Sequence, residues 1–110
     1  MLEENLIAPS ELAGRAEDVA RQMSLLANPS RLLILCRLAE GEASVGTLQA
    51  VVGLSQSALS QHLAKLREGD VVATRRDGQT IYYRIADTQT ERVMAALYEI
   101  FCRPAAINIA

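Results

Sequence analysis

Two cysteines and a single histidine are the most reactive side chains of this sequence. Cys36 lies in an apolar stretch, and Cys102 lies near the end of the 110-residue chain. A thiolate attacks sulfane or disulfide sulfur, but a free cysteine in an ordinary helical context can equally be a small packing residue. No Cys-x-x-Cys pair and no credible general base accompany either sulfur, so the residues favour neither an enzyme nor a catalytic site. We expect both cysteines to be reduced thiols, and their role stays open at this point.

A polar cluster that begins at position 55 could read nucleic acid. Gln56 and Gln61 each carry a donor and an acceptor that can pair with base edges. Ser57 and Ser60 are short enough to allow close approach to a groove, and Ser55 at a helix start can hold a phosphate. The same residues could also form a merely solvated surface, as the outer side of an amphipathic helix usually does.

The elements that must position this cluster are two short helices joined by a tight turn. Ser44 and Ser55 are N-cap residues for predicted helices over 45–52 and 56–68, and Gly53 supplies the turn between them. The predicted inward positions are Val45, Leu48, Val51 and Val52 in the first helix and Leu59, Leu63 and Leu66 in the second.

A basic hairpin follows these helices. Gly69 ends the second helix, and segments 71–76 and 79–85 are predicted strands joined by Asp77-Gly78. With those two residues as the turn, the predicted pairs are Arg76 with Gln79, Thr74 with Ile81 and Val72 with Tyr83. A helix-turn-helix followed by such a wing inserts its second helix into the major groove of duplex DNA. The predicted phosphate contacts are Lys65, Arg75 and Arg76.

Amphipathic helices flank this unit. The first begins near Glu11, with Leu12, Val19, Met23 and Leu26 on one face, and ends before Asn28. Asn28 and Pro29 then start a helix that Gly41 closes. The last begins at an Asp87 cap, ends at Pro104, and has Val93, Met94, Leu97, Tyr98, Ile100 and Phe101 inside.

The pattern as a whole predicts a mainly α fold with a small β-hairpin: a winged helix-turn-helix of five helices. It forms a single domain over 1–110, with flexible ends at 1–10 and 105–110. Because a domain this small often extends its core by pairing, we expect a homodimer through the first and last helices. The winged helix could also serve protein–protein contacts alone.

Charge and hydropathy limit the partners. The net charge is −2, but residues 54–84 hold five Lys/Arg and three Asp/Glu, so the positive charge is concentrated there. No apolar run is long enough to cross a bilayer, and Glu3 and Glu4 stand where a secretory signal carries positive charge. We therefore expect a cytoplasmic protein that binds DNA and no membrane.

Three stretches make the sequence resemble the ArsR/SmtB family of winged-helix repressors, from about Ala20 to Phe101. They are Ala27-Asn28-Pro29-Ser30-Arg31-Leu32, then Leu54-Ser55-Gln56-Ser57-Ala58-Leu59-Ser60-Gln61-His62-Leu63, and Arg75-Arg76-Asp77-Gly78-Gln79 with Tyr82-Tyr83. The resemblance implies dimers on palindromic operator DNA and loss of DNA affinity when an inducer binds. It also places His62 beside the DNA-reading face, where a DNA contact and a ring packed on the core both remain open.

The metal ligands of that family are missing. Ser44-Val45-Gly46 stands where metal-binding members have Cys-Val-Cys, and Asp87–Cys102 contains no histidine, so neither a metal nor another cofactor is expected. Cys36 and Cys102 instead resemble the dithiol pair of the BigR/SqrR/HlyU-like subgroup, which implies redox sensing through a bridge formed by persulfide or oxidant. One of the two thiols should then have a lowered pKa, helped by Arg37 or Arg103. A repressor with another inducer or none, and structural cysteines, is the alternative.

Overall fold

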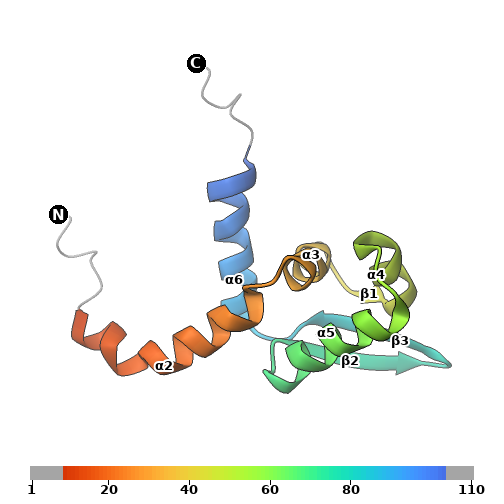
Figure 1. Ribbon diagram of the computed structural model, residues 1–110, viewed down its shortest axis with the longest axis horizontal. Helices are drawn as coiled ribbons and strands as arrows, with labels where there is room; N and C mark the ends of the chain where they lie inside the picture. The colour runs from red at the N-terminus through yellow and green to blue at the C-terminus, as the bar shows by residue number, and fades with distance from the viewer. Residues whose placement is uncertain (1–8, 104–110) are drawn as a thin grey trace, which may run out of the picture.

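A computed structural model describes residues 9–103, which form five α-helices and a three-stranded antiparallel sheet of order β1-β3-β2. The elements are α2 (Pro9–Leu26), α3 (Pro29–Leu38), β1 (Ala43–Ser44), α4 (Val45–Val52), α5 (Gln56–Glu68), β2 (Val72–Asp77), β3 (Thr80–Ile85), α6 (Thr88–Leu97) and the π-helical turn η1 (Tyr98–Cys102). Helices α3, α4 and α5 gather on the sheet, and α2 and α6 leave this body on the side away from the hairpin tip (Figure 1). The expected flexible ends lie outside the described residues, except that residues 9 and 10 are helical.

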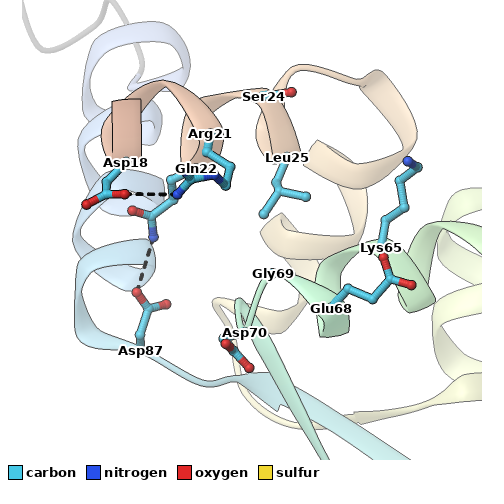
Figure 2. A pocket seen from close by; sticks show the side chains of 10 residues that line it. All are labelled: Asp18, Arg21, Gln22, Ser24, Leu25, Lys65, Glu68, Gly69, Asp70 and Asp87. Carbon is cyan, nitrogen blue, oxygen red and sulfur yellow. Dashed lines mark hydrogen bonds and ion pairs between the residues drawn. The ribbon is translucent and has the colours of Figure 1, made fainter. Parts of the chain in front are cut away.

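Side-chain caps begin three of the helices as predicted. The oxygens of Asn28, Ser44 and Ser55 accept hydrogen bonds from backbone N–H groups one turn on, at 2.9–3.2 Å. Asp87 occupies the N-cap position of α6, but its carboxylate does not cap the helix. It accepts a hydrogen bond from Gln22 Nε2 at 3.3 Å (Figure 2), so the predicted cap is wrong: the carboxylate turns to α2 instead.

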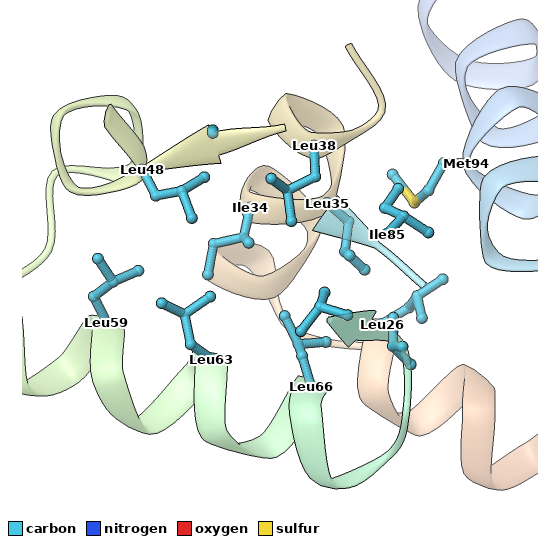
Figure 3. Packing of buried hydrophobic residues seen from close by; sticks show 13 residues of the cluster. Leu26, Ile34, Leu35, Leu38, Leu48, Leu59, Leu63, Leu66, Ile85 and Met94 are labelled. Atoms are coloured by element: carbon cyan, nitrogen blue, oxygen red, sulfur yellow. The ribbon is translucent and has the colours of Figure 1, made fainter. Parts of the chain in front are cut away.

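A leucine-rich core joins α3, α4 and α5. Leu59, Leu63 and Leu66 of α5 point at Ile34 and Leu35 of α3 (Figure 3), and all are buried. The inward prediction for Leu48 is also confirmed, and Val45 and Val52 are half-buried. Val51 is 48% exposed, so that prediction is wrong, because α4 is only eight residues long and presents a narrow contact stripe.

The hairpin forms with a different turn from the predicted one. Gly78 and Gln79 are the turn residues, and the pairs are Val72 with Ile85, Thr74 with Tyr83 and Arg76 with Ile81. Gly78 has φ +65°, whereas Gln79 does not adopt a positive φ, which matches the preference of a type II′ turn for glycine at its first position. Because every pairing moves by two residues, each side chain stays on its predicted face.

A third strand was not predicted. Ala43 and Ser44 of β1 pair with Tyr83 and Tyr82 of β3. Two residues are too few to show an alternating pattern, so only the tertiary fold reveals this strand.

The outer helices are poorly covered within one chain. Met94 is buried, and Val93 and Leu97 are half-buried, as predicted. Tyr98, Ile100 and Phe101 are 57–76% exposed, so the prediction that they lie inside is wrong for the single chain. Leu12, Val19 and Met23 on α2 are exposed as well. The two helices therefore present apolar surface that nothing in residues 9–103 covers.

A side chain at Gly69 is expected to displace Leu25, because a Cβ built there lies 2.3 Å from Leu25 Cδ1. Gly69→Ala forces Leu25 to another rotamer and should lower the free energy of unfolding by about 1–3 kcal/mol, measured by urea denaturation. Gly46→Ala is the control, since its Cβ would meet only Ser44 Oγ at 3.9 Å. Equal stability of the two variants would show that α2 does not pack closely on the end of α5.

Candidate nucleic-acid interface and thiol pair

The predicted DNA-reading face lies on the outer side of α5. Ser55, Gln56, Ser57, Ser60 and Gln61 are all exposed, and the leucine row on the opposite side of the helix is buried. Ser55 Oγ accepts from Ala58 N at 3.2 Å, so this hydroxyl orders the first turn of the helix. A groove of about 360 Å³ between α5 and β3 borders the face, lined by Ser60, Ala64, Arg67, Glu68 and Tyr83. This groove thus connects the outer side of α5 with the wing.

His62 lies at the edge of this face, half-buried, with Nδ1 3.4 Å from Arg31 Nη1. Arg31 also donates to the backbone oxygens of Leu25 and Ser24, at 2.6 and 3.3 Å. A guanidinium only donates, so a neutral His62 accepts through Nδ1 and carries its proton on Nε2. Arg31 therefore links α5 to the α2–α3 junction. The sequence did not predict this role, although Arg31 lies in the stretch Ala27–Leu32 that resembles the family.

Lys65 lies on a different side of α5, towards α2. It lines a cavity of about 520 Å³ together with Ser24 and Leu25 of α2 (Figure 2). The same cavity is lined by the acidic residues Asp18, Glu68, Asp70 and Asp87. Of the buried side-chain polar atoms in the described part of the chain, only Asp87 Oδ1 lacks a hydrogen-bond partner.

The two wing arginines have different surroundings. Arg75 Nε and Nη2 donate to the two carboxylate oxygens of Glu42 at 2.8 Å each, and the guanidinium lies 4.4 Å from the centre of the Tyr82 ring. Arg76 faces the other side of the sheet, with Thr74 and Tyr83, and makes no ion pair with any residue between 9 and 103. Arg75 thus ties the base of the wing to the segment before α4, and Arg76 is left to reach outward.

Cys36 and Cys102 are both exposed free thiols. The pKa of Cys36 is raised, although the residue is exposed overall. The main cause is partial burial of the thiol, followed by the nearby Cys102 and then the Glu40 carboxylate. Cys36 is therefore not the thiol of lowered pKa that the sequence predicts for at least one member of the pair. The side chains of the two neighbouring arginines are engaged elsewhere: Arg37 donates to the backbone oxygen of Gly41 at 3.1 Å, and Arg103 pairs with Glu99.

A π-helical turn precedes Arg103 and orients Cys102. Arg103 N donates to Tyr98 O at 2.9 Å, a spacing of five residues rather than four. Such turns are rare and shift the following side chains around the helix axis. Helical periodicity in the sequence does not distinguish this turn from a continued α-helix, so it was not predicted.

Two further features concern the part of the chain between residues 9 and 103. No group of three or more His, Cys, Asp or Glu side chains is placed to hold a metal ion. No helix there combines the length and apolar character needed to span a membrane.

A helix-turn-helix in which α5 is flanked by a basic hairpin defines the winged helix-turn-helix class. A family model described as "Bacterial regulatory protein, arsR family" matches residues 28–74. The biofilm growth-associated repressor of Agrobacterium fabrum is 48% identical over 90 residues, which cover 82% of this chain and 77% of that protein. The chain belongs to the arsR family of bacterial regulatory proteins.

Solved structures agree with that assignment. The transcriptional repressor BigR from Xylella fastidiosa has a TM-score of 0.84 and 40% identity, covering 89% of this chain and 100% of that chain. A winged helix-turn-helix DNA-binding domain from Mycobacterium bovis, described as homodimeric, has a TM-score of 0.71 and 34% identity, covering 86% of this chain and 89% of that chain. The expected mainly α winged fold is confirmed.

The ion pair between Glu42 and Arg75 makes the pKa of Glu42 depend on Arg75. The hydrogen bond from Arg75 is the main cause of the lowered pKa of Glu42, so the pair contributes to stability above the usual glutamate pKa and loses its contribution as the pH falls through the lowered value. In Arg75→Gln, the pKa of Glu42 should rise towards that of a free glutamate, followed by carboxyl carbon NMR. Arg76→Gln is the control, and an equal rise in both variants would contradict the assigned pairing.

Proposed function

We propose that the protein is a DNA-binding transcriptional repressor that binds palindromic operator DNA as a homodimer and releases it when Cys36 and Cys102 become joined. One observation carries the DNA-binding part: the exposed polar half of α5 stands beside the wing while the opposite half is buried. That arrangement presents hydrogen-bonding side chains without exposing the core.

Each exposed residue has a distinct proposed role. Gln56 and Gln61 contact base edges, and Ser57 and Ser60 allow the helix to lie deep in the major groove. Phosphates are held by Ser55 at the start of α5, by Arg76, and, with less direct access, by Lys65, Arg75 and His62. Arg75 acts mainly by fixing the wing, since its guanidinium already faces Glu42.

Exposed apolar residues support the proposed homodimer. Leu12, Val19 and Met23 on α2, with Tyr98, Ile100 and Phe101 after α6, are large side chains left in contact with solvent. Burying them against a second copy removes this apolar surface from water and places two α5 helices for two half-sites. The homodimeric relative from Mycobacterium bovis supports the same assembly.

DNA binding is tested with a duplex selected from a random-sequence pool by the wild-type protein. Gln61→Ala should weaken binding to that duplex about tenfold and leave binding to unrelated duplex nearly unchanged, because it loses a base contact. Arg76→Gln should weaken both and reduce the salt slope by about one, because it loses a phosphate contact. Fluorescence anisotropy across salt concentrations measures the affinities.

Arg92→Gln, an exposed change on α6, is the control and should bind as the wild type does. Native mass spectrometry should give two chains per duplex. A pool that yields no enriched duplex would favour the protein–protein alternative, and one chain per duplex would contradict the homodimer.

The proposed switch begins with transfer of sulfur. One protein thiolate attacks the outer sulfur of a persulfide and releases the carrier thiol, which leaves a protein persulfide. The second protein thiolate attacks the inner sulfur, expels hydrogen sulfide and forms a disulfide. If both thiols first accept sulfur, their reaction expels hydrogen sulfide and leaves a trisulfide. With peroxide, a sulfenic acid and one water form first, and the second thiol then displaces another water.

The bridge must also distinguish two conformations. A hundredfold loss of DNA affinity requires a difference of about 2.7 kcal/mol between the DNA-binding and released states. Cys36 is on α3, which packs on α5, and Cys102 follows α6, so a bond between them joins the reading unit to an outer helix. This connection supports a bridge that biases the position of α5.

Single serine variants test the switch. Cys36→Ser and Cys102→Ser should bind the selected duplex as the reduced wild type does and should remain bound after glutathione persulfide or peroxide. The wild type should dissociate, with intact mass showing loss of two hydrogens or net gain of sulfur. Continued binding by modified wild-type protein would leave the alternative, a repressor with another inducer or none.

A further inference from the structure

A cavity of about 600 Å³ lies beside the Cys36 thiol, between α3 and α6. Its apolar walls are Ala39, Met94, Ala95 and Tyr98, and its charged lining residues are Glu40 and Glu91. Its volume falls within the range of sites that enclose small molecules. The cavity lies on the opposite side of α3 from the core residues Ile34 and Leu35, so it is no part of the DNA-reading surface.

The lining carries two carboxylates and no basic side chain. Arg37 on α3 turns to the backbone oxygen of Gly41, and Arg103 pairs with Glu99, so these cations are held by other partners. Burial is the main cause of the raised pKa of Cys36, and the charges of Cys102 and then of Glu40 add to it, which agrees with a negative potential at the sulfur. An anion that approaches Cys36 is repelled, and a cation is attracted.

We propose that this cavity selects the inducer by charge, admitting small neutral or cationic thiol-reactive molecules to Cys36 and disfavouring anionic ones. Glu40 and Glu91 are the specificity-determining residues, and the apolar walls hold the uncharged part of the molecule. This inference rests on the proposed function, since it concerns which sulfur donors or oxidants reach the sensing thiol. Carriers that bear net negative charge, as glutathione persulfide does, are the poorer inducers.

Matched methanethiosulfonates measure the selection directly. The Cys36 thiolate attacks the sulfenyl sulfur, forms a mixed disulfide and expels methanesulfinate, whichever group the reagent carries. The trimethylammonium-ethyl reagent is cationic, the methyl reagent is neutral and the sulfonato-ethyl reagent is anionic. Rates are measured at low salt on Cys102→Ser, in which Cys36 is the only thiol, and are divided by the rates with a small neutral thiol.

The normalised rate should be about tenfold higher for the cationic than for the anionic reagent and should fall with added salt. Glu40→Gln and Glu91→Gln should each lower this ratio about threefold, and the double variant should bring it near unity. Both side chains are exposed, and neither carboxylate makes an ion pair within residues 9–103, so the fold should persist, which circular dichroism checks. Glu68→Gln on α5 is the matched control and should leave the ratio unchanged.

A normalised ratio of unity in Cys102→Ser, or a ratio that Glu40→Gln and Glu91→Gln leave unchanged, would overturn the proposal. Cysteamine persulfide and glutathione persulfide then test its consequence with the wild type on the selected duplex. Faster release by the cationic carrier supports charge selection, and equal release contradicts it. If neither carrier releases the duplex while the ratio of cationic to anionic reagent rates stays high, the thiol switch is refuted and the charge selection at Cys36 is not.

Discussion

The contact between the leucine row of α5 and helix α3 is the constraint on which the rest of the molecule depends. Leu59, Leu63 and Leu66 are buried against Ile34 and Leu35, and this burial fixes the rotation of α5 about its axis. Because one face of the helix is held inward, Gln56, Ser57, Ser60 and Gln61 must face outward. A rotation of α5 would expose leucine and bury glutamine, and both changes cost free energy.

The position of the sheet depends indirectly on the contact between α5 and α3. The turn after α5 leads directly into Val71 and Val72, which are buried in the same core. Asp70 supplies the left-handed backbone at that turn, with φ +59°, while Gly69 leaves room for Leu25 of α2. The pair between Arg75 and Glu42 then secures the wing to the start of the helix-turn-helix. The two reading elements are therefore fixed relative to each other by a shared core and one bidentate ion pair.

The outer helices are attached more sparsely. Within one chain, α2 is tied by Leu26 in the core, by hydrogen bonds from Gln22 to Asp87 and Thr90, and by Arg31 at the α2–α3 junction. Cys36 on α3 lies near Cys102 at the end of η1, and the charge of Cys102 is one cause of the raised pKa of Cys36. A bond formed there would join α3, which packs on α5, to the end of α6.

Local signals in the sequence determined the helices, three of their side-chain caps and the buried face of α5, because capping and helical periodicity depend on residues at most a few positions apart. Asn28, Ser44, Ser55 and the leucine row lie as predicted. Only the tertiary structure decided the turn at Gly78-Gln79, the pairing of β1, and the turn of Asp87 towards Gln22. It also gave Arg75 and Arg76 different surroundings, and it partly buried Cys36 and brought Cys102 near it, so that the pKa of Cys36 is raised. These features depend on which distant side chains meet, and that is set by packing the whole chain rather than by spacing along it.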